Sequence, residues 1–431
     1  MKKTSALGLL LLGTAGIAFA QTTAPIPPTV GASPRANRGA PTREMSIRAA
    51  VDASYDSNAF GLSDAAIARG IGNRSKDDFR ITPSLLLDIF QPFGRQSAFL
   101  RGSIGYDFYT KNSQLNRARI GLNGGANVAV LNNCSVTPSA NYQRQRSNAG
   151  DIFAISPVPV VDRVNTEEQF SYGVDAQCAG AIGISPTFGY RHSQIRNTSS
   201  FYELNDSNQD SFNASLGYQR PSLGRISVYG SYSEGEYIHR NVLGLPNVIP
   251  GIPLDGVKSY SAGGRFERDI GSRMSGSISV GFSWVDPKAV FSRKFRGSTY
   301  ALALAIRPSD RFSVNVDASR SADLSNTVFA TFALTQIYSL NGTYRLNRKM
   351  AVNFGSSYQK RDYRQNAQAV DNAGVVKNDE FIRAYGGLVY DLNRRLRLNG
   401  LISQQRRKSD NAFFNYNNTT VSLGLSFALG R

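Results

Sequence analysis

Residues 274–284, Met-Ser-Gly-Ser-Ile-Ser-Val-Gly-Phe-Ser-Trp, decide the fold, because two kinds of side chain alternate along them without interruption. The larger apolar residues Ile278, Val280 and Phe282 all fall on even positions, and serine fills nearly every odd one. A period of two places successive side chains on opposite faces of a β-strand. One apolar face and one small polar face suit a strand that has lipid on one side and water on the other. The stretch therefore predicts one strand of a membrane-spanning β-barrel.

The same unit recurs from near Met45 to the C-terminus, and it predicts an all-β transmembrane antiparallel β-barrel of about 18 strands. Hydrophobic residues make up only 41% of the chain, and the sequence after residue 20 has no run of roughly 18 apolar residues that could form a membrane helix. The predicted strands are 46–56, 78–90, 96–109, 116–130, 135–146, 166–178, 181–194, 210–219, 226–236, 258–268, 274–285, 297–307, 312–321, 328–346, 350–361, 379–392, 396–404 and 419–429.

The connections between these strands are of two kinds, which is the asymmetry of an outer-membrane barrel. Short turns built from Gly, Pro, Asn, Asp and Ser alternate with mostly longer polar loops. An even strand number then places both termini at the short-turn end, which we expect to be periplasmic. The short turns are 91–94, 132–133, 221–224, 269–272, 308–310, 347–349 and 393–395, and the longer loops are 57–77, 147–165, 195–209, 237–257, 286–296, 362–378 and 405–418.

A soluble β-sandwich or a secreted repeat protein is the alternative fold. So many strands with Ser, Gly and Asn on the second face would give such a protein a poor solvated exterior. The predicted outer face also carries aromatic pairs near strand ends, as the interfacial girdles of a membrane barrel do. These pairs are Tyr106 with Phe108, Phe170 with Tyr172, Phe188 with Tyr190, and Tyr338 with Tyr344.

The N-terminus reads as a secretory signal. Two lysines, an apolar run over 6–19 and the small-x-small site Ala18-Phe19-Ala20 predict a signal peptide at residues 1–20, with a single membrane anchor as the alternative. Residues 21–44 contain five prolines and few apolar residues, which predicts a disordered periplasmic segment. This segment is too short for a plug domain, which disfavours an energised siderophore-type transporter. The barrel is expected over 45–431, in the outer membrane of a Gram-negative cell.

The last predicted strand carries a second signal. Its pattern Ser422-x-Gly424-x-x-Phe427-x-Leu429 resembles the C-terminal targeting signal of outer-membrane barrels. In that signal, a polar residue, a glycine and two apolar or aromatic residues engage the barrel insertion machinery, which the resemblance therefore implies as a partner. The usual terminal aromatic is missing here, because Gly430 and Arg431 follow.

Two cysteines in a secreted chain suggest pairing. If strands 135–146 and 166–178 pair antiparallel so that residue numbers sum to 312, Cys134 faces Cys178 and Tyr142 faces Phe170, all with outward parity. This register predicts a cross-strand disulfide at the periplasmic rim. The alternative is two buried free thiols.

The formal net charge is +18, or +16 once Lys2 and Lys3 leave with the signal peptide. Parity places nine bases and seven acids in the lumen, so the excess positive charge falls mainly at the two rims. Because a secreted protein has little access to nucleic acid, we expect rim contacts with phospholipid headgroups and lipopolysaccharide phosphates, with ligand binding as the alternative. The predicted lumen-lining charges are Arg48, Arg80, Arg101, Arg117, Arg119, Arg191, Arg265, Arg383, Arg397, Asp52, Asp88, Asp107, Asp175, Glu267, Asp317 and Asp391.

No catalytic, cofactor-binding or metal-binding constellation stands out. A Ser/His site on a strand needs the two side chains at i and i+2. His192 has Gln194 at that position, and His239 has no serine nearby in the sequence. No histidine and cysteine spacing typical of metal ligands occurs, and no carboxylate pair stands out for glycoside cleavage. We therefore expect no enzyme activity and no cofactor.

The opening Tyr55-Asp56-Ser57-Asn58-Ala59-Phe60, followed by Asp77-Asp78 and residues 81–85, resembles the β-barrel porins encoded with bacterial exopolysaccharide and capsule biosynthesis genes. The turns at 346–349 and 392–395 are similar as well. The likeness spans nearly the whole barrel, but its motifs are structural and give no catalytic residues. It implies an outer-membrane conduit or accessory barrel for polysaccharide secretion, with exopolysaccharide and its export apparatus as partners.

The sequence thus predicts a passive polar conduit. Two alternatives stay open: a non-conducting surface barrel whose basic loops bind glycan or lipopolysaccharide, and a general small-solute porin. The unusually apolar loop 237–257 is expected either to fold into the lumen as a constriction or to pack on a neighbouring loop.

Overall fold

The structure is a computed structural model, and it describes residues 43–65, 67, 74–147, 165–180, 182–200, 202–243, 251–290, 292–325, 330–365 and 376–429. The predicted signal peptide, residues 21–42 of the proline-rich segment and the last two residues lie outside these ranges. Among the described residues, no helix is both long and apolar enough to cross a membrane.

The described residues form eighteen strands and three short 3₁₀ helices, and each predicted strand overlaps one of the observed strands. The strands are β1 (Glu44–Asp56), β2 (Asp78–Phe93), β3 (Gln96–Tyr109), β4 (Arg117–Leu131), β5 (Cys134–Arg146), β6 (Thr166–Cys178), β7 (Gly183–Asn197), β8 (Ser207–Arg220), β9 (Gly224–Asn241), β10 (Leu254–Ile270), β11 (Met274–Pro287), β12 (Phe295–Ser309), β13 (Phe312–Leu324), β14 (Ala330–Arg345), β15 (Met350–Gln365), β16 (Asn378–Asp391), β17 (Leu396–Ser409) and β18 (Tyr416–Ala428). The 3₁₀ helices are η1 (Ser113–Leu115), η3 (Glu203–Asn205) and η5 (Ala412–Phe414).

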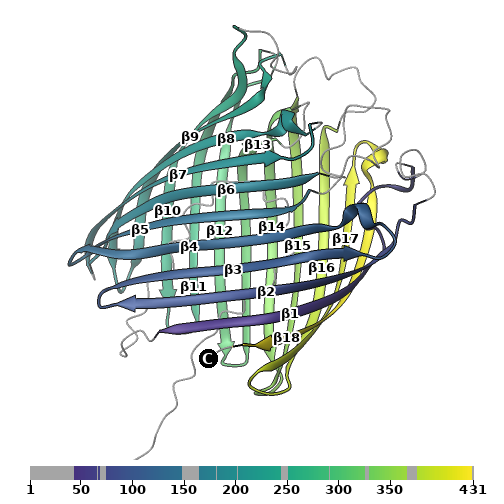
Figure 1. Cartoon of the computed structure of the whole chain (residues 1–431). Coiled ribbons are helices and arrows are strands. Elements are labelled where there is room, and N and C mark those ends of the chain that lie inside the picture. Colours follow the sequence, from purple (N-terminus) through teal and green to yellow (C-terminus); the bar gives the residue numbers. More distant parts are fainter. Residues whose placement is uncertain are drawn as a thin grey trace, which may run out of the picture.

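Every strand pairs antiparallel with its neighbours in the chain, and β1 also pairs with β18. The sheet therefore closes on itself as a barrel with no free edge (Figure 1). The predicted all-β antiparallel barrel is confirmed. Closure matters physically because lipid offers no partner for unpaired backbone N–H and C=O groups.

The register fixes which side chains face outward. Ile278 lies opposite Phe266 on β10 and Leu302 on β12, and partners in register share a face of the sheet. Followed around the barrel, this face carries large exposed apolar side chains on nearly every strand, such as Val228, Leu423 and Ile402. The serines of β11 lie on the opposite face and line the interior.

The two ends of the barrel differ. At one end, short connections join β2 to β3, β4 to β5 and the following pairs, and β1 begins and β18 ends there as well (Figure 1). We call it the turn end, and the opposite one the loop end. That the turn end faces the periplasm stays a prediction.

The strands reach further at the loop end than the sequence predicted. β9 continues to Asn241 rather than 236, and β17 to Ser409 rather than 404. The alternation fades there because the outward positions become charged instead of apolar. On β17, for example, Ile402 is followed by Gln404, Arg406 and Lys408. A strand that has left the hydrocarbon no longer needs an apolar outer face, so it loses its sequence signature.

An aromatic band and a charged tier mark this change around the outer wall. Tyr190, Phe212, Tyr232, Tyr260 and Trp284 lie opposite one another on β7 to β11, with ring centroids 4.9 Å apart for Tyr190 and Phe212 and 5.0 Å for Tyr232 and Tyr260. One or two outward positions closer to the loop end, each strand from β5 to β17 carries a charged or polar residue. These residues, the charged tier, are Arg144, Glu168, His192, Asp210, Glu234, Lys258, Asp286, Arg296, Arg320, Gln336, Lys360, Glu380 and Gln404.

Candidate functional site

The interior of the barrel is the candidate functional site, and part of its wall is neutral. The inward positions of β11 are Ser275, Ser277, Ser279, Gly281 and Ser283, and they lie opposite Ala305, Ala303, Ala301, Thr299 and Gly297 of β12. Across these positions of two fully described strands, no charged side chain faces inward. The result is a strip along the barrel without inward charge, in which the buried Ser279 and Ser283 donate to the carbonyl oxygens of Ala301 and Tyr260.

Most of the predicted lumen charges lie on one arc of the wall, which runs from β15 through β18 and on from β1 to β4. Several of them are paired locally. Arg101 Nε lies 3.4 Å from Asp88 Oδ1, and Arg397 Nε lies 2.6 Å from Asp391 Oδ1. Asp107 accepts a hydrogen bond from Thr82 and lies between two guanidinium groups, with Arg80 at 3.8 Å and Arg119 at 3.6 Å. The arc nevertheless keeps a net positive charge, because it carries seven of the predicted bases against four of the predicted acids, and Asp107 is shared by two of those bases.

The other predicted lumen residues have mostly short-range polar contacts. Arg48 donates to Ser46, Asp52 accepts from Asn399, Arg117 donates to the Gln114 carbonyl, and Asp317 accepts from Ser339. Arg265 and Arg383 lie over the rings of Tyr229 and Tyr385, Glu267 lies 3.5 Å from Arg225, and Asp175 and Arg191 face inward on the adjacent strands β6 and β7.

Some interior residues were missed by the sequence analysis. At the loop end, the inward carboxylate of Asp379 on β16 lies 2.7 Å from Arg407 Nη2 on β17 and 3.4 Å from Arg361 Nε on β15. All three side chains are at most 4% exposed, and both guanidinium groups lie over the ring of Phe381, at 4.9 and 4.5 Å. We call this group, together with Tyr363, the β15–β17 cluster. Arg361 and Asp379 lie at the ends of the predicted strands 350–361 and 379–392, so their parity was available from sequence, whereas Tyr363 and Arg407 lie beyond the predicted ends at 361 and 404.

The β9–β10 hairpin supplies a second buried group. Arg240 and Asp255 form an ion pair at 2.8 Å and are almost completely buried. The Tyr237 hydroxyl donates to the carbonyl oxygens of Ser325 and Thr331, and Arg240 donates to the Ala330 carbonyl. The hairpin therefore reaches past the β11–β12 loop and fastens to the ends of β13 and β14.

This contact bears on the two alternatives for loop 237–257. Its described parts pack on neighbouring hairpins, since Val290 N also donates to the Val242 carbonyl and Lys288 N to the Gly256 carbonyl. Residues 244–250, including Pro246 and Ile249, lie outside the described part of the chain.

Burial of the inner wall changes along the barrel axis. On the neighbouring strands β2 and β3, Asp88 and Arg101 near the turn end have side chains 52% and 60% exposed, whereas Asp107 near the loop end is 6% exposed. The inward residues Asp379, Tyr363, Asp255 and Thr331 are buried at the loop end as well. We call this ring of buried inward side chains the collar. The inward charges of β2 and β3 are thus exposed near the turn end and buried near the loop end, whereas Arg225 and Ser185, near the turn end of β9 and β7, are buried as well.

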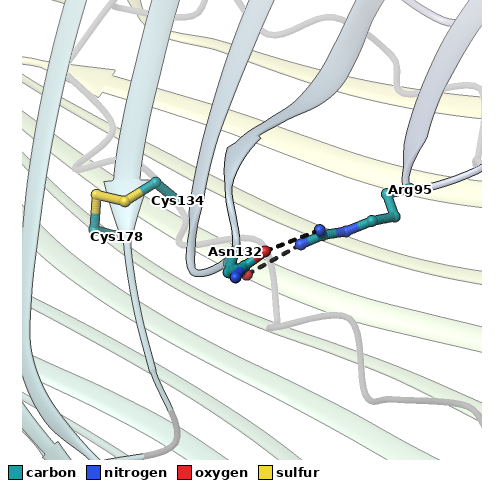
Figure 2. The surroundings of a disulfide bond; sticks show 4 residues. All are labelled: Arg95, Asn132, Cys134 and Cys178. Atoms are coloured by element: carbon teal, nitrogen blue, oxygen red, sulfur yellow. Dashed lines mark hydrogen bonds between the residues drawn. A yellow bond between two sulfur atoms is a disulfide. The ribbon is translucent and has the colours of Figure 1, made fainter.

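A disulfide joins Cys134 and Cys178, with Cα atoms 4.0 Å apart and a sequence separation of 44. The register of β5 and β6 places Cys134 opposite Cys178 and Tyr142 opposite Phe170. Figure 2 shows the bridge beside the β4–β5 turn, where Arg95 donates to the side chain and the carbonyl oxygen of Asn132. Both cysteines lie at the turn end, so the bridge fastens the part of the wall that the collar does not reach.

The residues of the predicted targeting signal lie on the closing strand. Ser422 and Gly424 face inward on β18, and Phe427 and Leu429 are exposed on the outer face. A Cβ atom on Gly424 would overlap the side chains of Asp52 and Asn399. A packing reason for this glycine therefore exists beside the targeting role, which stays a prediction.

Each of the two histidines lies next to an aspartate. His192 faces outward and its Nδ1 lies 2.8 Å from Asp210, while His239 lies 3.6 Å from Asp206 at the loop end. Within the described ranges, no group of three or more His, Cys, Asp or Glu side chains is placed to hold a metal ion.

The sequence from residue 48 to residue 429 matches the model of the family described as "Putative beta-barrel porin 2". The chain belongs to this family. Members are barrels of the porin type, which are channels rather than enzymes, and the protein is accordingly a porin-like channel of the Gram-negative outer membrane. None of the curated proteins matches the sequence.

Solved structures with a similar shape include siderophore receptors, such as PirA of Acinetobacter baumannii, and outer-membrane channels. The channel OccK2 of Pseudomonas aeruginosa, solved in complex with glucuronate, is 10% identical, with 90% of this chain and 99% of that chain covered and a TM-score of 0.44. OprD of the same organism is 10% identical (90% and 96% covered, TM-score 0.43), and the channel DcaP of Acinetobacter baumannii is 14% identical (90% and 97% covered, TM-score 0.42). These scores are too low to carry a functional argument.

Proposed function

We propose that this porin-like barrel is a passive conduit for a hydrated glycan and serves exopolysaccharide export. The observation that supports the proposal is the neutral strip on β11 and β12, where hydroxyl, methyl and glycine surfaces replace charge from Ser275 to Ala305. A sugar polymer exposes hydroxyl groups on all sides, and a wall that offers weak, interchangeable hydrogen bonds lets it slide without being held.

The experiment is single-channel recording of the refolded protein in planar bilayers with a neutral linear oligosaccharide added. We expect an open conductance that the sugar interrupts in brief, reversible blocks. Ser277→Asp would place a charge in the middle of the strip, and Ser277→Asn is its uncharged control of nearly equal volume. The aspartate should change the duration of the blocks several-fold while the asparagine leaves it near the wild-type value. Sugar blocks that are insensitive to both changes would count against the role of the strip.

Export itself needs a cellular readout. Deleting the gene should leave exopolysaccharide trapped or lowered in the medium, and re-expression should restore it. An unchanged yield would leave the general small-solute porin as the better description.

The collar supports a second candidate. Because the loop end is packed with buried side chains, the barrel could be non-conducting and act through its basic loops, binding glycan or lipopolysaccharide at the surface. A silent bilayer combined with retention of the protein on immobilised glycan would favour this candidate over the conduit.

A further inference from the structure

A cavity of about 240 Å³ lies at the loop end, where the β17–β18 hairpin meets the loop between β1 and β2. Four of the residues around it are cationic, namely Lys76, Arg406, Arg407 and Lys408, and one, Asp64, is acidic. The remaining polar lining includes Asn415 and Asn417. The cavity is thus a local concentration of positive charge and amide groups, and Arg407 is shared between its lining and the β15–β17 cluster.

The four cations are not equivalent. Arg407 faces inward to Asp379, and Lys76 Nζ lies 2.5 Å from Asp64. Arg406 and Lys408 face outward, with Asn417 directly opposite Arg406 on β18. Within the described part of the chain, neither outward cation has a hydrogen-bond or ion-pair partner, so their charge is available to a ligand.

This distinguishes them from other cations at the same height on the outer wall. Arg144 is 3.4 Å from Glu168, Lys258 is 3.6 Å from Glu234, and Lys360 is 3.9 Å from Glu380. Those pairs neutralise themselves across neighbouring strands. Arg406 lies opposite Asn417 on β18 and opposite Ile382 on β16, so no carboxylate balances its charge across the strands. Lys408 lies opposite Glu380 on β16, which is already 3.9 Å from Lys360.

The position along the strands indicates what the ligand is attached to. Ile402 and Val421 are exposed apolar residues that face lipid, at 56% and 47%. The next outward pair is Gln404 with Thr419, joined by a hydrogen bond of 2.7 Å, and the pair after that is Arg406 with Asn417. Each step of two residues is roughly 7 Å. The cations therefore lie just past the apolar band, at the height where lipid headgroups carry their phosphates.

We propose that Arg406, Lys408 and Asn417, with Lys76 on the facing loop, form a binding site for the phosphate group of a saccharide lipid headgroup in the outer leaflet. An arginine guanidinium donates two parallel hydrogen bonds to a phosphate, a lysine adds a point charge, and an amide N–H completes the set. The unpaired charge is thereby compensated by lipid rather than by protein. The site lies on the outer face, so it is independent of conduction.

The test uses the refolded full chain and native mass spectrometry with two probes, bisphosphorylated lipid A and dephosphorylated lipid A. The double variant Arg406→Gln/Lys408→Gln is compared with Arg394→Gln/Arg395→Gln, which removes two exposed charges from the turn before β17, at the other end of the barrel. We expect the wild type and the control to retain phosphorylated lipid A, and the double variant to retain it roughly 30-fold less well, because each of the two basic residues near a headgroup contributes about 1 kcal/mol. Bilayer conductance should be unchanged in both variants.

Three results would overturn the proposal. One is equal loss in both double variants, which would indicate a general charge effect. The second is equal retention of the two lipids by the wild type, a comparison that needs no variant. The third is inorganic phosphate displacing phosphorylated lipid A at matched concentration, which would identify the ligand as free phosphate rather than a headgroup. None of these results depends on whether the barrel conducts glycan.

Discussion

The two ends of the barrel interior are built from the same alternation and yet have opposite character. Near the turn end, the Arg101 and Asp88 side chains are more than half exposed, although they form an ion pair. Near the loop end, the Arg407 and Asp379 side chains form a similar pair with at most 2% exposure. The residue types are alike, so the difference comes from what covers them.

How far an ion pair is buried decides how much its loss would destabilise each end of the barrel. An exposed pair gains little, because water screens the charges and competes for their hydrogen bonds. A buried pair is costly to break, because the remaining charge stays out of water. The loop end should therefore be rigid and intolerant of substitution, whereas the turn end should tolerate change and depend on its disulfide.

The largest expected effect comes from removing the shared carboxylate of the collar. Asp379→Ala takes away the anion that faces both Arg361 and Arg407, and breaking a buried pair of this kind costs about 3–5 kcal/mol. We expect a lower free energy of unfolding in urea and a higher, noisier conductance, because the collar loosens.

The matched control is Asp391→Ala at the turn end. Its partner Arg397 keeps water around it, since the two side chains are 39% and 22% exposed, so the loss should be at most about 1 kcal/mol. Equal destabilisation by the two variants would contradict the contrast between the ends.

At the turn end the disulfide should matter most. Replacing both Cys134 and Cys178 by Ser opens a loop of 44 residues and should lower the free energy of unfolding by up to about 4 kcal/mol in the chain-entropy model. Reducing agent should lower the wild type by the same amount and leave the double variant unchanged. A change in the free energy of unfolding of the double variant on reduction would show that the reducing agent acts on something other than this disulfide.

The contact of the β9–β10 hairpin with the ends of β13 and β14 can be weakened by a smaller change. Tyr237→Phe removes a buried hydroxyl that donates to Ser325 and Thr331, which should cost about 1–3 kcal/mol because two buried carbonyls lose a donor. Tyr232→Phe on the same strand is the control, since its hydroxyl donates to Glu234 on the outer face. Only Tyr237→Phe should alter the frequency of current fluctuations in a bilayer. If the two variants gave identical current traces, the contact of this hairpin would have no part in opening and closing the channel.

The smallest effect concerns an exposed pair in the loops. Hydrogen bonds from Lys111, at 2.8 Å, and from Ser75 lower the pKa of Asp77 to about 2. Because the folded pKa lies below the unfolded one, the stabilisation is present above the ordinary aspartate pKa and is lost as pH falls through about 2. Proteolysis of this loop by pepsin should accelerate between pH 4 and pH 2 (roughly the span of the two pKa values) in the wild type. Asp77→Asn should be fast throughout, and a parallel pH response in both proteins would exclude the pair as its cause.

The part of the fold inside the membrane follows from sequence because one physical rule governs it. Lipid outside and water inside impose a period of two, so strand positions, facing and the register of Cys134 with Cys178 could all be read from parity. Arg225 is an example of a residue that this rule did not place. It lies next to a turn, at the rim where the excess positive charge was expected, but it is buried, faces inward and pairs with Glu267.

The collar could not be derived in the same way. Its side chains are held by contacts between loops and strand ends that are distant in sequence, such as the contact of Tyr237 with Thr331. The periodicity of the sequence does not show which hairpins contact each other. Beyond the apolar band both faces of a strand are polar, so Arg407 fell in the predicted loop 405–418, while Arg361 and Asp379 stood at the ends of predicted strands with no sign that they would be buried together. Burial by other loops, rather than the residues themselves, makes them part of the interior.

The most direct test of a conduit that is accessible at the turn end and narrow at the loop end is polymer exclusion in a planar bilayer. Neutral polyethylene glycols of increasing size are added to one side at a time while single-channel conductance is recorded. We predict that mid-sized polymers lower the conductance from the turn-end side but have no effect from the loop-end side. An equal response from both sides, or no conductance at all, would contradict this asymmetric conduit.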